Sequence, residues 1–329
     1  MKRAQYTERG PDPQASIAAV ELATPEPAAG QALLEVLAAP INPSDVLTLT
    51  GLYGMLPPLP AVGGNEGVGR VLAVGPDTQG PAIGQTVLLP VGCGTWSTHV
   101  LADAKSLMPL PNDADPLQLA MMTVNPPTAL LMLREFVDLQ PGEWVIQNAA
   151  NSGVGAYLIQ LAKVRGLKTV NVVRRESAVA GVRETGGDVV LVDAPDLAKR
   201  VREATGAAAI RLGIDAVGGT STDHLAMSLA EGGVLVNYGA MSGEPCQLSP
   251  ASFVFRNITL RGFWLSKWFI GSTPAQRIAV FGEVATLIAT GKLKSRIQAT
   301  YGIDQIKQAV AAAAAGERNG KILLVPNAQ

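Results

Sequence analysis

The segment Gln147–Gly155, QNAANSGVG, combines small residues and hydrogen-bonding residues at a spacing suited to holding a phosphate group. It joins the apolar run WVIQNA to the amphipathic stretch SGVGAYLIQLAKVRG. A strand, a small-residue turn and a helix that opens at Gly153 place backbone N–H groups and the positive end of the helix dipole where a pyrophosphate can dock. The turn departs from GxGxxG, since Ala149 or Ala150 stands where the early glycines would be. A tight strand–helix turn of any α/β protein is the alternative.

Two arginines, Arg174 and Arg175, stand where the next strand of this region is expected to end. Arg174 lies 21 residues after Gly153 (174 − 153 = 21). NAD-binding proteins place a carboxylate at a spacing of about 20 residues to hold the ribose hydroxyls. Guanidinium groups pair instead with phosphate oxygens, such as those of a 2′-phosphate. A solvated basic strand end is the alternative, but beside the phosphate turn the arginines favour NADP(H).

The elements that must position these residues alternate strictly from Pro141 onward. The expected strands are 144–149, 169–174, 188–193, 210–218, 233–239 and 258–263, and the expected helices are 152–166, 177–185, 196–205 and 222–230. Continuous apolar strands separated by helices predict a parallel sheet covered on both faces. The sequence therefore predicts a doubly wound unit of six strands.

The sequence before this unit has a different pattern of apolar residues. Short Val-, Leu- and Ala-rich runs at 32–41, 67–75 and 85–91 are bounded by Gly, Pro, Asn and Asp, which predicts a compact, mostly β domain over residues 1–115. Helical spacing follows at 116–135, interrupted by Pro126-Pro127. The tail, with helices expected near 274–290 and 304–315 and strands near 294–301 and 321–325, is expected to return to the first domain.

The composition narrows the functional classes. The 329 residues carry a net charge of −1, with 47% hydrophobic and 16% charged residues, which gives no indication of a nucleic-acid or membrane-surface partner. Two cysteines and two histidines are too few for a disulfide framework or a metal site. No apolar run approaches the roughly 20 residues that span a bilayer, and the N-terminal stretch lacks the apolar region of a secretory signal. A cytoplasmic protein without a bound metal is expected.

Eight motifs together resemble one known family. They are INPSD (41–45), LPAVGGNEG (59–67), GTW (94–96), VNPPTA (124–129), QNAANSGVG (147–155), NVVR (171–174), YGAM (238–241) and LRGFWLSKW (260–268). Nearly end to end, the chain resembles the zinc-independent medium-chain dehydrogenases/reductases, and within them the mitochondrial-type trans-2-enoyl thioester (2-enoyl-CoA) reductases. The resemblance implies an α/β fold with a GroES-like, mostly β catalytic domain (1–118 and 266–329) and a Rossmann NADP-binding domain (119–265). It also implies a homodimer.

The same resemblance implies roles for particular residues. Zinc-dependent relatives place a cysteine and a histidine where this chain has Asn42-Pro43 and Asn65. The catalytic tyrosine of the family falls on Tyr53. Its NADPH contacts fall on Asn125, Asn151, Ser152, Gly153, Val154, Arg174, Arg175, Glu176, Tyr238, Gly239, Ala240, Met241, Phe263, Trp264, Leu265, Ser266 and Lys321. Ala240 replaces a usual glycine. The mitochondrial presequence of eukaryotic members has no counterpart here, so a bacterial cytosolic relative is expected.

Such a reductase delivers a hydride to Cβ of an α,β-unsaturated thioester. Negative charge then develops on the thioester oxygen, and Cα must be protonated. The hydroxyl of Tyr53 could donate a hydrogen bond to that oxygen or a proton to Cα without a metal. Three alternatives stay open: Tyr53 is an ordinary loop tyrosine of a quinone or enone reductase, the chain binds NADPH without catalysis, or the acyl group is carried by an acyl carrier protein in place of CoA.

Overall fold

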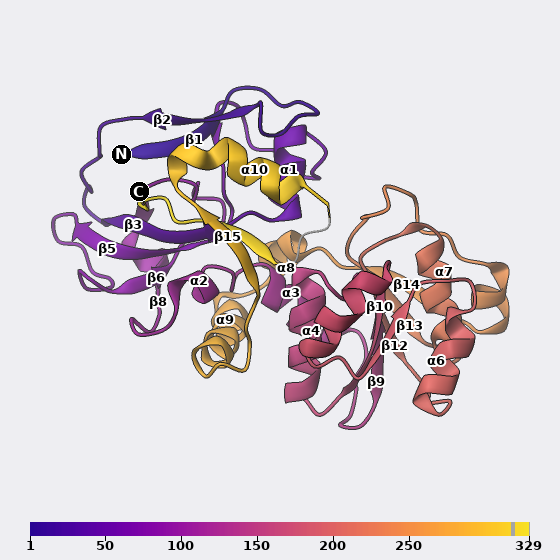
Figure 1. Ribbon diagram of the computed structural model, residues 1–329. Coiled ribbons are helices and arrows are strands. Elements are labelled where there is room, and N and C mark those ends of the chain that lie inside the picture. Colours follow the sequence, from indigo (N-terminus) through magenta and orange to yellow (C-terminus); the bar gives the residue numbers. More distant parts are fainter. Residues whose placement is uncertain (317–319, 329) are drawn as a thin grey trace. The chain divides into compact units, whose positions relative to one another are not determined.

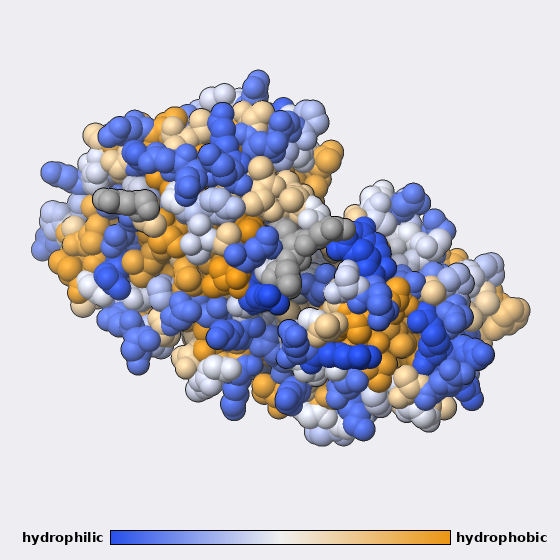
Figure 2. Space-filling model, viewed as in Figure 1, coloured by the Kyte–Doolittle hydropathy of each residue, from blue (hydrophilic) through white to orange (hydrophobic). Residues whose placement is uncertain are grey.

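Two compact units make up the chain in the computed structural model, which describes residues 1–316 and 320–328. The first unit combines Met1–Val124 with Phe281–Gln329, and the second is the continuous segment Asn125–Val280. The sequence predicts domain boundaries at 118/119 and 265/266, and these boundaries stay a prediction. Within the described ranges, no helix is both long and apolar enough to cross a membrane. Hydrophilic residues occupy much of the face shown in Figure 2, with smaller apolar areas between them.

Short strands dominate the first unit. Its strands are β1 (Lys2–Tyr6), β2 (Ile17–Glu21), β3 (Gln31–Pro40), β4 (Ala61–Val62), β5 (Val68–Val74), β6 (Thr86–Leu88), β7 (His99–Asp103), β8 (Met108–Pro109), β15 (Ile297–Tyr301) and β16 (Lys321–Leu324). Its helices are α1 (Pro43–Thr50), η1 (Ala104–Ser106), α2 (Pro116–Leu119), η4 (Ile303–Gln305) and α10 (Ile306–Ala314), and α9 (Pro274–Ala289) runs across the unit boundary. A small sheet has the order β2-β1-β4, and a larger one the order β15-β16-β3-β5-β6-β8, with β7 also paired to β3.

Strand β3 is the centre of the larger sheet because it is antiparallel to β5, β7 and β16. The strand at the C-terminal end thereby joins one near the N-terminus, with Leu324 opposite Ala39. An extensive apolar core lies within the unit, and Trp96 is completely buried in it. Helix α10 covers this core next to α1 (Figure 1), which explains why the tail forms no domain of its own.

Helix α1 was not recognised from the sequence, although its ends carry clear signals. Asn42 occupies the N-cap position with extended backbone, Pro43 follows, and the backbone N–H of Asn42 donates to the Asp45 carboxylate at 2.7 Å. Proline at the first helical position and an acid in the first turn both favour a helix start. Gly51 ends the helix at φ 80°, a left-handed conformation that glycine adopts without strain.

Strands and helices alternate through the second unit as the sequence predicts. Its strands are β9 (Trp144–Gln147), β10 (Lys168–Val173), β11 (Val189–Val192), β12 (Leu212–Asp215), β13 (Val234–Asn237) and β14 (Thr259–Gly262). Its helices are α3 (Asn125–Glu135), α4 (Gly153–Val164), η2 (Glu176–Ala178), α5 (Val179–Glu184), α6 (Leu197–Thr205), α7 (Gly219–Ser228), the π-helical turn η3 (Ala251–Phe255) and α8 (Leu265–Gly271). The six strands form one sheet in the order β11-β10-β9-β12-β13-β14, all parallel.

Both faces of the central strands β9, β10 and β12 are buried, which explains why these strands are mostly apolar. Val172 and Val173 are neighbours in β10 and belong to different core clusters, because successive side chains in a strand point to opposite faces. Helices α3 and α4 pack together on one side and α6 and α7 on the other (Figure 1). The predicted doubly wound unit is therefore confirmed.

Candidate active site

The strand order reverses between β9 and β12 in the second unit. Counted along the chain, the order is 3-2-1-4-5-6, the doubly wound arrangement that binds dinucleotides. In such sheets ligands bind outside the carboxyl ends of the strands at the reversal point. The turn that follows β9 lies at this point, and it contains the expected phosphate contacts Asn151–Val154.

The turn between β9 and α4 has the geometry of a phosphate cradle. Ser152 is the N-cap of α4, and its Oγ accepts the backbone N–H of Gly155 at 3.1 Å. Ala149 takes φ 45°, the left-handed region that glycine usually occupies, at one of the places where the sequence departs from GxGxxG. A Cβ at Gly155 would lie 2.6 Å from the carbonyl oxygen of Ala150, so only glycine allows the turn to approach the helix. The remaining N–H groups at the start of α4 can receive an anion.

The arginine pair lies at the carboxyl end of β10. Val173 is the last residue of the strand, Arg174 is exposed, and Arg175 is half-buried. Glu176 begins η2 and is also exposed. The strand end next to the phosphate turn therefore presents guanidinium groups, as a 2′-phosphate requires. The assignment of Arg174, Arg175 and Glu176 to the cofactor stays a prediction.

Two residues at the reversal point were missed in the sequence, Asn148 and Asp215. Asn148 Nδ2 donates to Asp215 Oδ1 at 2.7 Å, and Asn148 Oδ1 accepts the N–H of Ala216 at 2.7 Å. The buried Asp215 carboxylate also accepts from the backbone of Val217 and Gly218 and from the side chains of Thr222 and Asn237. This Asp215 network fastens the carboxyl ends of β9, β12 and β13. In the sequence, Asp215 followed closely by the Gly218-Gly219 pair was the pattern that could have indicated this site.

The expected nicotinamide-side turn, Tyr238–Met241, follows β13 and is held by the same network. Tyr238 N donates to Asp215 O at 2.9 Å and Met241 N to Ala216 O at 3.1 Å. Gly239 has no room for a side chain, since a Cβ there would lie 2.7 Å from Ala216 O. Burial raises the pKa of the Tyr238 hydroxyl, and its hydrogen bond with Ser152 opposes this. The structure thus brings this turn and the phosphate turn into contact.

The remaining expected cofactor residues of the second unit lie at two helix starts. Phe263 follows β14, donates its N–H to Asn237 O at 2.9 Å, and packs edge-to-face on Phe136. Trp264 is the N-cap of α8 and is 40% exposed, and Leu265 and Ser266 form the first turn of that helix. Asn125 is the buried first residue of α3. Their contacts with a cofactor stay predictions.

Tyr53 and Lys321 belong to the first unit. Tyr53 is half-buried just beyond the end of α1, and its backbone N–H donates to Leu47 O at 3.2 Å. Lys321 begins β16 and is buried, with Nζ donating to Asn42 Oδ1. Asn42 and Asn65 are among the residues that the resemblance places where zinc-dependent relatives have ligands. The Asn42 side chain donates to Glu66 at 2.6 Å, and the Asn65 side chain donates to Asp45 at 2.7 Å. The described part of the chain contains no group of three His, Cys, Asp or Glu residues arranged to hold a metal ion.

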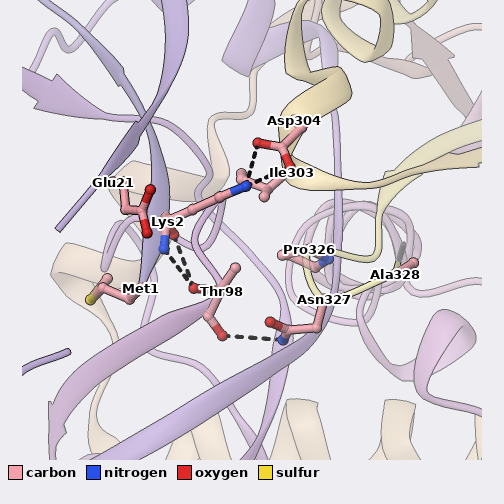
Figure 3. A pocket seen from close by; sticks show the side chains of 9 residues that line it. All are labelled: Met1, Lys2, Glu21, Thr98, Ile303, Asp304, Pro326, Asn327 and Ala328. Atoms are coloured by element: carbon pink, nitrogen blue, oxygen red, sulfur yellow. Dashed lines mark hydrogen bonds and ion pairs between the residues drawn. The ribbon is translucent and has the colours of Figure 1, made fainter. Parts of the chain in front are cut away.

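A separate pocket of the first unit, about 350 Å³ in volume, contains none of these residues (Figure 3). Within it, Lys2 Nζ pairs with Asp304 at 2.7 Å and Asn327 Nδ2 donates to Thr98 O at 3.3 Å. It offers no catalytic grouping.

Comparison with known proteins decides the family. Residues 28–112 match the alcohol dehydrogenase GroES-like domain, and residues 153–280 match the zinc-binding dehydrogenase model. The mitochondrial enoyl-[acyl-carrier-protein] reductase of Caenorhabditis elegans is 39% identical over 277 residues, which cover 82% of this chain and 79% of that protein. The chain belongs to the enoyl reductase family. Its fold is accordingly a GroES-like domain combined with a Rossmann domain.

Solved structures agree with this family over nearly the whole chain. Etr1p in complex with NADP and crotonyl-CoA superposes with a TM-score of 0.87 at 25% identity and covers 98% of both chains. Etr1p is the mitochondrial 2-enoyl thioester reductase of Candida tropicalis. A mycobacterial quinone oxidoreductase superposes with a TM-score of 0.85 at 26% identity and covers 99% of this chain and all of its own, 100%. Enoyl reductases and quinone reductases thus share the architecture of this chain.

Proposed function

We propose that this enoyl reductase uses NADPH to reduce trans-2-enoyl thioesters to acyl thioesters. The observation that carries the proposal is the 39% identity to an enoyl-[acyl-carrier-protein] reductase along 82% of the chain. The solved complex of Etr1p with NADP and crotonyl-CoA supports both the cofactor and the substrate class. The Gly155 cradle and the N-terminus of α4 fit a pyrophosphate, and Arg174 and Arg175 fit a 2′-phosphate.

NADPH, when bound, supplies the hydride that is added to Cβ of the substrate. In the proposed site Asn151–Val154 hold its pyrophosphate and Tyr238–Met241 border its nicotinamide. The residues of this chain then have two tasks: to stabilise the negative charge on the thioester oxygen and to provide the proton for Cα. A hydroxyl aimed at developing charge can perform either task. We assign the hydroxyl of Tyr53 to this role.

A steady-state screen tests the proposal. The purified protein should oxidise NADPH with crotonyl-CoA and longer trans-2-enoyl-CoAs, with the matching enoyl-carrier protein as a further substrate and NADH as the cofactor control. A quinone reductase is the second candidate, favoured by the likeness to the mycobacterial quinone oxidoreductase. Turnover of a quinone without turnover of any enoyl thioester would establish that candidate. Tight NADPH binding without any turnover would indicate a binding protein.

We further propose a homodimer and a cytoplasmic location. Pairing of two β14 edges would continue the six-stranded sheet across a two-fold axis, and Etr1p has been solved as a heterodimer with Etr2p. The two cysteines, Cys93 and Cys246, are both free, which suits a reducing compartment. Sedimentation and cell fractionation test the two statements separately.

A further inference from the structure

Four polar side chains are buried together in the first unit. Asn42, Asp45 and Glu66 are 1%, 3% and 0% exposed, and Lys321 is 7% exposed. They come from the start of α1, the loop before β5 and the start of β16. Buried charges persist only when they are paired and hydrogen-bonded. The mechanism proposed above assigns no role to Glu66 or Asn42.

The hydrogen bonds of this cluster run in one direction. Lys321 Nζ donates to Asn42 Oδ1, and Asn42 Nδ2 donates to Glu66 Oε1 at 2.6 Å. An ammonium group can only donate and an ionised carboxylate can only accept, so the amide between them has a single satisfactory orientation. Asn42 therefore links a buried positive charge to a buried negative charge.

The second oxygen of Glu66 holds a different segment. Glu66 Oε2 accepts the backbone N–H groups of Thr123 at 3.1 Å and Val124 at 2.9 Å. The next residue is Asn125, which begins α3. All three partners of the carboxylate are donors, so a protonated Glu66 would direct its O–H at groups that cannot accept it.

The first oxygen of Glu66 is connected to the Tyr53 segment. Asn42 caps α1, and its own N–H donates to Asp45 Oδ2 at 2.7 Å. At the other end of α1, the N–H groups of Leu52 and Tyr53 both donate to Leu47 O. One rigid helix of 8 residues thus joins Asn42 to the backbone of Tyr53.

We propose that the ionised carboxylate of Glu66 is a positioning residue for the reduction, which fixes α1 with Tyr53 through Asn42 and fixes the segment Thr123-Val124 through its two backbone N–H groups. The inference rests on the proposed function, since it concerns the placement of the proposed proton donor. Displacing a reacting group by about 1 Å can slow a reaction about 100-fold. A loosened α1 therefore lowers kcat more than it changes NADPH affinity.

The ionisation of Glu66 should make kcat depend on pH. Burial raises the pKa of Glu66 to about 7, while Lys321 and the Asn42 hydrogen bond hold it down and Asp45 raises it. Asp45 on α1 and Lys321 on β16 are the charged groups that act on this carboxyl. Since only the ionised form suits the three donors, kcat falls as the pH drops through the pKa of Glu66.

Glu66→Gln tests the inference, with Glu35→Gln as the matched control, because Glu35 is a half-buried acid of β3 outside this cluster. In Glu66→Gln, kcat with crotonyl-CoA should fall at least about 10-fold. The fall of kcat toward low pH near neutrality, here called the acid limb of the pH profile of kcat, should disappear. NADPH affinity should stay within about threefold. Glu66→Asp should restore the acid limb. Unchanged kcat, or an unchanged limb in Glu66→Gln, would overturn the inference.

Asn42→Asp gives a directional check if Glu66→Gln does not fold. The new carboxylate beside Glu66 raises the pKa of Glu66, so the acid limb should move to higher pH. A limb that stays in place or moves down contradicts the inference.

Hydrogen exchange provides a readout that does not require turnover. In Glu66→Gln, amide protection should fall together in peptides covering residues 43–53 and 123–125, and it should not change in Glu35→Gln. Unchanged protection in both peptides would refute the linkage. Wild-type protein that shows this linkage but reduces no enoyl thioester would refute only the proposed function.

Discussion

The Asp215 network offers the sharpest test of how the second unit supports its site. In Asp215→Asn the amide oxygen can still face Asn148, Val217 and Gly218, which lie on the Oδ1 side at 2.7, 2.9 and 3.1 Å. The new NH₂ group must then face the side chains that donate to Oδ2. The change removes the negative charge and one acceptor while leaving the shape of the side chain nearly the same.

Two of the side chains that donate to Oδ2, Thr222 and Asn237, respond differently. The Thr222 hydroxyl can rotate and accept, but Asn237 Nδ2 also donates to Gly239 O at 2.9 Å and cannot reverse without losing that bond. One buried donor–donor contact and three weakened charge-assisted bonds cost about 2–4 kcal/mol. At about 2–4 °C per kcal/mol, we expect Tm of the second unit to fall by about 10 °C. NADPH affinity should fall as well, because Asn237 steadies the Tyr238–Met241 turn.

Thermal unfolding followed by circular dichroism measures Tm, urea unfolding followed by tryptophan fluorescence measures the free energy of unfolding, and NADPH titration measures the affinity. Asp196→Asn is the matched control. Asp196 makes an exposed ion pair with Arg200 at 2.9 Å, and its substitution should change the free energy of unfolding by less than about 1 kcal/mol. If Asp215→Asn destabilises the protein no more than Asp196→Asn, the network does not hold the strand ends and the reasoning fails.

Three further predictions concern the proposed site. Tyr53→Phe should lower kcat about 100- to 10,000-fold with NADPH affinity near wild type; a kcat within about threefold of wild type in stopped-flow and steady-state assays would exclude Tyr53 as the donor. Replacing Arg174 and Arg175 together by alanine should raise KM for NADPH about 10- to 100-fold and leave KM for NADH unchanged; parallel losses with both cofactors would argue against a 2′-phosphate site. Burial raises the pKa of Asp45 to about 6 and that of Glu66 to about 7, from 3.8 and 4.5. Because the folded state then binds these protons more tightly than the unfolded state, their contribution to stability is complete below about pH 4 and is lost as the pH rises through 6 and 7. Denaturation curves should show a larger free energy of unfolding at pH 5.5 than at pH 8, and Glu66→Gln should flatten this slope.

The second unit was predictable from the sequence because its signals are local. Strand β11 (Val189–Val192) is an unbroken apolar run, and the start of α4 is marked by the N-cap residue Ser152. The phosphate turn could be found for the same reason. Strand, small residues and helix follow one another directly in the chain.

The buried polar contacts could not be predicted because they join distant segments. Asn42 and Lys321 are 279 positions apart, and Glu66 reaches backbone groups 57 and 58 positions later. No local sequence pattern predicts such partners. Helix α1 is a different case, since Asn42, Pro43 and Asp45 carry ordinary start signals that the neighbouring glycines and prolines obscured.

The route of the chain through the two units has a consequence for synthesis. The second unit is one continuous segment, 125–280, whereas the first unit lacks β16 until residues 321–324 are made. Ile322, Leu323 and Leu324 are completely buried in β16, so the Ala39-Pro40 end of β3 lacks its partner until residues 321–324 leave the ribosome. Since domains fold as units during translation, the second unit should fold first. Limited proteolysis of nascent chains stalled shortly before β16 should cut the N-terminal segment and spare residues 125–280.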